Sequence, residues 1–308
     1  MLKKQICLVC PVLMILIVPA LARAQGSADP LAAAIAFQTD YQITPNITYL
    51  TANNYEAKLD VYRRRNSPQP RPTLINIHGG GWTGGTKEAN VLMFLPFLQM
   101  GWNVVNVEYR LARVSLAPAA VEDCLCALRW VYRNAKQYDF DTARLVVTGD
   151  SAGAHLALTT GMIPASAGLD RECPGSEELK VAAIINWYGI TDVVDLLDGP
   201  NMKTYAVTWL GSMPDRDVIA KRVSPLTYVR AGLPPVLTIH GDADPTVPYT
   251  HALRLRAALD KVRVPNRLVT VPGGHHGNFS QAERLTIFAA IREFLDQYVP
   301  GTSGSASR

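Results

Sequence analysis

Short apolar runs alternate with longer amphipathic stretches through most of this 308-residue chain. The apolar runs are rich in β-branched residues, as at Val104, Val105 and Val107, which is typical of buried strands. We expect strands at residues 58–63, 73–78, 103–109, 144–149, 181–187, 235–240 and 266–271. The stretches between them repeat their apolar positions every three or four residues, which predicts helices. These helices are expected at 90–99, 119–137, 151–162, 250–261 and 281–298.

This alternation predicts the fold class and the domain limits. Strands separated by helices of about ten or more residues indicate an α/β protein, with a mostly parallel central sheet and helices on both faces. One domain is expected over residues 56–300, after an N-terminal extension at 25–55. Residues 188–232 are long for one crossover and rich in turn residues, which indicates a small insertion. The small, polar residues 301–308 are expected to form a disordered tail.

The first 24 residues have the pattern of a secretory signal. Lys3 and Lys4 precede an apolar run at 6–20, and a small-x-small site follows at 22–24. The alternative is an uncleaved membrane anchor, but the run is shorter than the roughly 20 apolar residues of a spanning helix. We therefore expect cleavage after Ala24, a secreted or periplasmic protein, and no stable membrane insertion after cleavage.

The composition excludes several classes of protein. With 48% hydrophobic and 18% charged residues, the chain can bury a sizeable core and is not expected to be disordered. The formal net charge is +4, and part of it lies in the signal, which has basic residues and no acidic ones. The nearly neutral remainder gives no electrostatic reason to expect nucleic acid as a partner. The sequence does not define an oligomeric state.

Three cysteines remain after cleavage, namely Cys124, Cys126 and Cys173. In an oxidising compartment Cys173 can pair with Cys124 or with Cys126, and three buried thiols are the alternative. No spacing of cysteine and histidine resembles a zinc site, so we expect no metal.

The first chemical motif is Gly149-Asp150-Ser151-Ala152-Gly153, which lies between an expected strand and an expected helix. A G-x-S-x-G sequence in this context forms a tight turn that exposes the serine hydroxyl above the sheet. Ser151 is therefore the candidate nucleophile.

A glycine run, His78-Gly79-Gly80-Gly81-Trp82, follows the expected strand at 73–78. Glycines let the backbone approach a ligand closely and direct N–H groups at it. The N–H groups of Gly80 and Gly81, with that of Ala152, are the candidate oxyanion hole for a tetrahedral intermediate.

Two later strands end in acidic and imidazole side chains. Asp242 and Asp244 follow the strand at 235–240, and His275 and His276 follow the strand at 266–271. The chain order serine, aspartate, histidine is that of the α/β-hydrolases. The motifs alone do not choose within either pair.

Taken together, the motifs resemble an α/β-hydrolase of the hormone-sensitive-lipase-like and feruloyl- and acetyl-xylan-esterase-like group. The resemblance extends over residues 56–298 and is carried by HGGGW at 78–82, VEYRLA at 107–112, ALRWV at 127–131, GDSAGAHLA at 149–157, HGDADPTVPY at 240–249 and PGGHHGNF at 272–279. It implies an α/β-hydrolase fold whose insertion lies over the active site. It also implies Asp244 as the acid and His276 as the base, although the doubled histidine blurs the family pattern.

The resemblance implies a serine carboxylic-ester hydrolase that works through an acyl-enzyme on short-chain or aryl esters of the acetyl or feruloyl type, without a cofactor. The substrate would be a small-molecule or polysaccharide-linked ester. The candidates for substrate contact are Trp82, Trp187, Tyr188 and Trp209. An amidase or arylformamidase of the same fold and a catalytically inactive binding protein are the alternatives.

Four polar residues near these motifs are expected to be structural. Asp150 should point away from the nucleophile, and His78 should hold the glycine run by hydrogen bonds. His155, one turn into the helix after Ser151, is expected to pack in the core, and His240 is expected to be structural.

Overall fold

The computed structural model describes residues 30–301. The expected signal at 1–24 and residues 302–308 of the expected tail lie outside the described residues. Within the described part, no helix combines the length and the apolar character needed to cross a bilayer.

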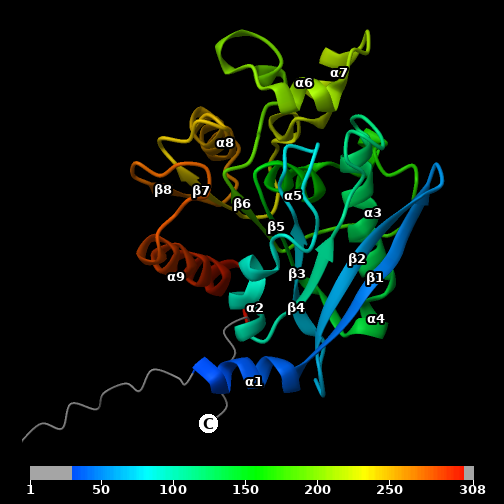
Figure 1. Cartoon of the computed structure of the whole chain (residues 1–308), viewed down its shortest axis with the longest axis vertical. Helices are drawn as coiled ribbons and strands as arrows, with labels where there is room; N and C mark the ends of the chain where they lie inside the picture. Colours follow the sequence, from blue (N-terminus) through cyan, green and yellow to red (C-terminus); the bar gives the residue numbers. More distant parts are fainter. Residues whose placement is uncertain (1–29, 302–308) are drawn as a thin grey trace, which may run out of the picture.

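An eight-stranded sheet forms the centre of the molecule, with the strand order β1-β2-β4-β3-β5-β6-β7-β8 (Figure 1). Strands β3 to β8 run parallel to one another, while the β1–β2 and β2–β4 pairs are antiparallel. The strands are β1 Tyr41–Ala52, β2 Tyr55–Arg64, β3 Arg71–Ile77, β4 Asn103–Val107, β5 Phe140–Asp150, β6 Ala183–Trp187, β7 Val236–Gly241 and β8 Asn266–Val271. The expected α/β class with a mostly parallel sheet is confirmed.

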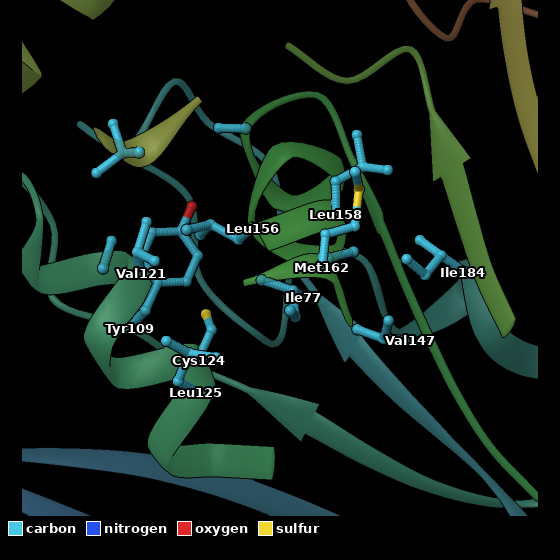
Figure 2. Packing of buried hydrophobic residues seen from close by; sticks show 14 of the residues in the cluster. Ile77, Tyr109, Val121, Cys124, Leu125, Val147, Leu156, Leu158, Met162 and Ile184 are labelled. Carbon is cyan, nitrogen blue, oxygen red and sulfur yellow. The ribbon is translucent and has the colours of Figure 1, made fainter. Parts of the chain in front are cut away.

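Helices cover both faces of this sheet. They are α1 Pro30–Asp40, α2 Leu95–Gln99, α3 Ala119–Arg133, α4 Ala135–Tyr138, α5 Ala152–Met162, α6 Thr204–Leu210, α7 Arg216–Val223, α8 Thr250–Lys261 and α9 Gln281–Tyr298. Val147 of β5 packs into one core with residues of α3, α5 and α8, part of which Figure 2 shows. The preceding Val146 packs into the other core, with residues of α2 and α9. Neighbouring strand residues thus point to opposite faces of the sheet, and each face packs against helices in an apolar core.

The sheet begins earlier in the chain than the sequence indicated. Residues 30–52, expected to be part of an extension, form α1 and the edge strand β1, which pairs with β2. Most side chains of β1 are exposed or half-buried, so the strand lacks the apolar alternation that predicts strands.

The segment at 188–232 contains α6 and α7, which lie together at one end of the molecule in Figure 1. Tyr205 of α6 donates a hydrogen bond to the Thr246 carbonyl at 3.1 Å. Its Cβ lies beside Gly81, where an added Cβ would be 2.9 Å away. The insertion therefore contacts both the glycine run and the loop after β7.

One disulfide joins Cys126 of α3 to Cys173, 47 residues later. Cys124 is a buried free thiol. Of the pairings that the sequence left open, the structure has Cys126 with Cys173.

Candidate active site

Ser151 lies in the sharp turn between β5 and α5. Its backbone φ is 54°, a value that residues other than glycine rarely adopt. Its N–H donates to the Trp187 carbonyl at 2.9 Å. The flanking glycines are required, because a Cβ on Gly153 would come within 2.1 Å of the Ile77 carbonyl oxygen. One on Gly149 would come within 2.5 Å of that same oxygen. The G-x-S-x-G sequence therefore forms the strained turn that the motif predicts.

The loops after β7 and β8 bring an imidazole and a carboxylate to this serine. His276 Nε2 lies 2.9 Å from Ser151 Oγ, and His276 Nδ1 lies 2.7 Å from Asp244 Oδ2. Because an ionised carboxylate can only accept, Nδ1 carries the ring proton and Nε2 is free to accept from the hydroxyl. The three side chains form one hydrogen-bonded series.

The Asp244 carboxylate is surrounded by donors. Its side chain has no exposed surface, and its Oδ1 accepts from the N–H groups of Thr246 at 2.7 Å and Val247 at 3.0 Å. Burial opposes ionisation, but hydrogen bonds from His240 and His276 outweigh it and hold the pKa of Asp244 well below its usual range. Asp244 is therefore ionised at neutral pH.

The neighbouring candidates take no part in this series. His275 is exposed. Asp242 is exposed too, and its Oδ1 accepts from the Gly273 N–H at 2.6 Å, within the loops themselves. The structure thus brings His276 and Asp244 to Ser151 and leaves the other two outside.

The glycine run lies against the same turn. Gly80 and Gly81 have φ angles of 115° and 59°, and the Gly80 carbonyl accepts from the N–H groups of Thr83 and Gly84. Within residues 30–301, the N–H groups of Gly80, Gly81 and Ala152 donate to no protein acceptor. Ala152 is also the first residue of α5, where the helix dipole favours negative charge. The three candidate oxyanion donors are thus unpaired.

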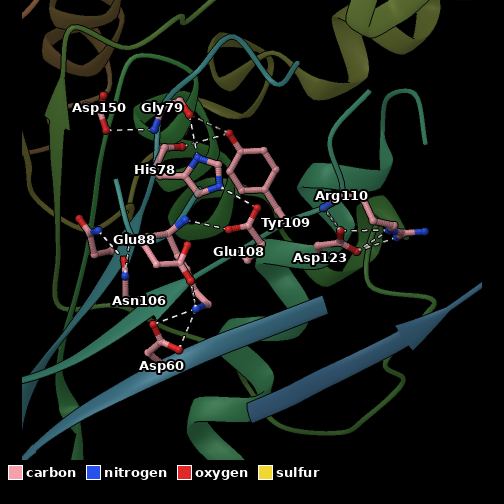
Figure 3. A network of polar contacts seen from close by, with 12 residues as sticks. Asp60, His78, Gly79, Glu88, Asn106, Glu108, Tyr109, Arg110, Asp123 and Asp150 are labelled. Carbon is pink, nitrogen blue, oxygen red and sulfur yellow. Dashed lines mark hydrogen bonds and ion pairs between the residues drawn. The ribbon is translucent and has the colours of Figure 1, made fainter. Parts of the chain in front are cut away.

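A buried polar network fixes the start of the glycine run (Figure 3). Asp150 Oδ1 accepts from the Gly79 N–H at 3.0 Å and from Asn90 Nδ2 at 2.9 Å, and burial raises the pKa of Asp150. The His78 ring stacks on Tyr109 with centroids 4.4 Å apart, and the Tyr109 hydroxyl donates to the His78 carbonyl at 3.0 Å. Asp150 and His78 therefore hold the backbone of the loop and do not contact Ser151.

Three of the four aromatic residues expected at the substrate are in the core. Trp82 and Trp209 stack with centroids 4.1 Å apart and have no exposed surface, and Trp82 Nε1 donates to His155 Nδ1. Trp187 is 3% exposed and packs against Phe288. This burial corrects the expectation that Trp82, Trp187 and Trp209 contact substrate, because an indole with almost no exposed surface offers almost no contact area.

Tyr188 is the one of the four that adjoins the series, with its ring centroid 4.6 Å from that of His276. Arg284 of α9 also supports this loop, although no pattern in the sequence indicates it. Its Nη2 donates to the Gly277 carbonyl at 2.8 Å and its Nε to the Phe279 carbonyl at 3.2 Å. An arginine in an amphipathic helix is indistinguishable in sequence from a solvated one.

The donor set around Ser151 suits acyl chemistry. Among the described residues, no group of three or more histidine, cysteine, aspartate or glutamate side chains could hold a metal ion. What the geometry provides is a hydroxyl, an imidazole that can accept its proton, a carboxylate that orients the imidazole, and unpaired N–H groups nearby.

Comparisons with known proteins agree with this reading of the fold. The BD-FAE family model matches residues 59–259, and a model described as TAP-like protein matches residues 216–303. The esterase LipQ of Mycobacterium tuberculosis is 30% identical over 254 residues, which are 78% of this chain and 59% of LipQ. The chain thus spans about three fifths of that relative.

Solved structures resemble the whole described domain. Esterase 2 of Thermogutta terrifontis has 26% sequence identity and a TM-score of 0.70, over 88% of this chain and 96% of that one. A truncated carbohydrate esterase from gut microbiota has the same identity and TM-score, over 83% and 98% of the two chains. The family model covers most of the sheet and the serine turn, so the chain belongs to the BD-FAE family, within the α/β-hydrolase fold.

Proposed function

We propose that the protein is a serine carboxylic-ester hydrolase. The observation that carries the proposal is the series of Ser151 Oγ, His276 and Asp244, joined by contacts of 2.9 and 2.7 Å. Its relatives and structural neighbours are named as esterases, which supports the same chemistry.

The reaction follows from the protonation states. His276 Nε2 takes the hydroxyl proton while Ser151 Oγ bonds to the ester carbonyl carbon, and Asp244 stabilises the resulting imidazolium. The N–H groups of Gly80, Gly81 and Ala152 would bind the oxyanion, a contribution of about 3–4 kcal/mol for each donor. The imidazolium then gives its proton to the departing alcohol, and an acyl-enzyme remains.

Water then hydrolyses the acyl-enzyme by the same proton transfers in reverse order. His276 takes a proton from water, the hydroxide oxygen bonds to the acyl carbon, and the proton passes to Ser151 Oγ as the acid leaves. Short-chain or aryl esters of the acetyl or feruloyl type, free or linked to polysaccharide, are the substrates we propose. The acetyl and carbohydrate esterases among the relatives support this class.

The test is turnover of p-nitrophenyl acetate, butyrate and octanoate and of methyl ferulate, with Ser151→Ala as the inactive control. Wild type should react with a fluorophosphonate probe, and the alanine variant should lose probe labelling and several orders of magnitude in kcat/KM. Near-normal turnover by Ser151→Ala would refute the assignment. Faster cleavage of a matched amide than of the ester would instead support an amidase.

We also propose export by cleavage after Ala24. N-terminal sequencing of protein recovered from the medium or periplasm should then begin at Gln25. Recovery of the uncleaved chain in the membrane fraction would contradict this.

A further inference from the structure

A cavity of about 540 Å³ lies at the edge of the sheet opposite to the catalytic series. It is lined by residues that precede β6 and β7 and by the last turn of α5, whereas Ser151 and Asp244 follow the carboxyl ends of their strands. Helix α5 begins next to Ser151, and its 11 residues place about 16 Å between the serine turn and the cavity. The cavity is therefore separate from the proposed active site.

The outer wall of this cavity is fastened to α3. Arg129 of α3 is buried and pairs with Asp170 at 2.5 Å and with Glu177 at 2.6 Å, both in the segment between α5 and β6. The disulfide from Cys126 to Cys173 ties the same segment to the same helix. The cavity is therefore preformed, and its volume lies in the range of about 300–1,000 Å³ that is usual for small-molecule sites.

The lining indicates the kind of molecule that fits. Within residues 30–301, no aromatic side chain lines the cavity. Its larger apolar side chains are Leu125, Ile163, Leu169, Leu179, Val181 and Leu233. Because these walls offer aliphatic contacts and no ring on which a flat molecule could stack, they suit a flexible aliphatic chain.

The charges of the lining balance one another, with one exception. Arg129 is shared between two carboxylates, and Lys180 pairs with Glu178 at 2.7 Å. Arg230 also lines the cavity, and within the described residues it has no carboxylate partner. The cavity therefore contains one cation whose charge is not neutralised by a neighbouring side chain.

The guanidinium of Arg230 is held in place with one side open. Its Nη1 donates to the Met162 carbonyl at 2.5 Å and to the Tyr228 carbonyl at 3.1 Å. Its Nε and Nη2 donate to no protein acceptor in the part of the chain that the structure describes. Nε and Nη2 form the fork that binds a carboxylate through two parallel hydrogen bonds.

We propose that this cavity binds an aliphatic carboxylate, with its chain against the apolar walls and its carboxylate on the open side of Arg230. The site goes beyond the proposed function and does not depend on it, because Ser151, Asp244 and His276 are absent from the lining.

The test is a titration of the whole protein with octanoate at pH 7.5, followed by NMR of ¹³C-methyl-labelled leucine and valine. Octanamide is the neutral ligand of the same shape. Octanoate should give saturable shifts of the Leu169 and Leu233 methyl signals. Octanamide should bind about tenfold or more weakly, because it lacks the charge that Arg230 neutralises.

Three variants locate the binding. Arg230→Gln should weaken octanoate binding about tenfold and remove the preference over octanamide, which a general loss of structure would not do. Ala165→Trp places an indole on an exposed part of the lining and should weaken both ligands alike. The matched control is Arg222→Gln, since Arg222 also donates only to carbonyls, those of Ala167 and Gly168, but does not line the cavity. It should leave octanoate binding within about twofold of wild type.

Three results would overturn the proposal. They are shifts confined to methyl groups near Ser151, equal affinity of the wild type for octanoate and octanamide, and equal losses in Arg230→Gln and Arg222→Gln. Failure of the wild type to cleave esters would refute the proposed function alone, since the titration measures binding and not turnover.

Discussion

The carboxylate of Asp244 can be tested by the smallest change available, Asp244→Asn. Three N–H groups donate to the two carboxylate oxygens, those of Thr246 and Val247 to Oδ1 and that of His276 to Oδ2. Asparagine has the same shape but offers one acceptor oxygen and one NH₂ group. In either orientation its NH₂ therefore meets at least one N–H group, and one oxygen of acceptor capacity is lost.

The expected loss of activity is set by the less harmful of the two orientations of the asparagine amide. If the NH₂ faces His276, it favours the tautomer with the proton on Nε2, which points that proton at Ser151 Oγ and removes the base. If it faces Thr246 and Val247, two buried N–H groups lose their acceptor. A wrong tautomer in a serine triad lowers kcat by about 10⁴, or about 5.4 kcal/mol at 1.36 kcal/mol per factor of ten.

The assay is kcat/KM for p-nitrophenyl acetate at pH 7, with Tm measured in parallel to establish that the variant is folded. Asp242→Asn is the matched control, since Asp242 is exposed and, within residues 30–301, its carboxylate accepts only from the Gly273 N–H. We expect the control to stay within about threefold of wild type. Activity of Asp244→Asn within tenfold of wild type, or equal losses in both variants, would refute the reasoning.

Three further predictions concern the support of the site. Asp150→Ala removes the acceptor of the Gly79 N–H, so it should raise the activation free energy for kcat/KM and lower the free energy of unfolding by about 1–3 kcal/mol each. Asp150→Asn should keep most of the activity and stability, because one oxygen makes the contact. Steady-state kinetics and Tm measurements test both variants. Replacing Cys126 and Cys173 by serine should cost up to about 4 kcal/mol of unfolding free energy for a loop of 47 residues, measured by urea denaturation, and an unchanged midpoint would exclude the bond. Burial lowers the pKa of His155 from 6.5 to about 3, so the unfolded chain binds this proton first, and the free energy of unfolding should fall by up to about 1.4 kcal/mol per unit as pH drops through this range. Denaturation of His155→Gln between pH 4 and 7 should show a flatter slope, and equal slopes would contradict the prediction.

The positions of the catalytic candidates along the chain could be predicted because each follows a strand. Strand ends are local features, and apolar runs followed by glycine, serine, aspartate or histidine mark them directly in the sequence. Parallel strands bring their carboxyl ends to one edge of the sheet, so Ser151, Gly80 and the two later loops had to meet there.

Side-chain direction and burial needed the structure. Trp82 and Trp209 are 127 residues apart in sequence and stack only because the insertion folds back onto the glycine run. An aromatic residue has the same composition signal in a core and at a binding surface, so sequence could not separate the two. The edge strand β1 carried no strand pattern for a different reason, since most of its side chains are exposed or half-buried and need not alternate between apolar and polar.

The sequence by itself determined the order of the strands from β2 to β8, most of the helices between them, and the chemical groups at the strand ends, because those depend on neighbours along the chain. The motifs alone left His275 and His276, Asp242 and Asp244, and Cys124 and Cys126 undistinguished; the family resemblance favoured His276 and Asp244, and only the tertiary structure brought these two to Ser151 and paired Cys126 with Cys173. Residues one or two positions apart share their sequence context but point in different directions, and the partner that distinguishes them comes from a distant segment. His240 is the same case, since its bond to the Val247 carbonyl depends on how the loop after β7 turns back over the strand.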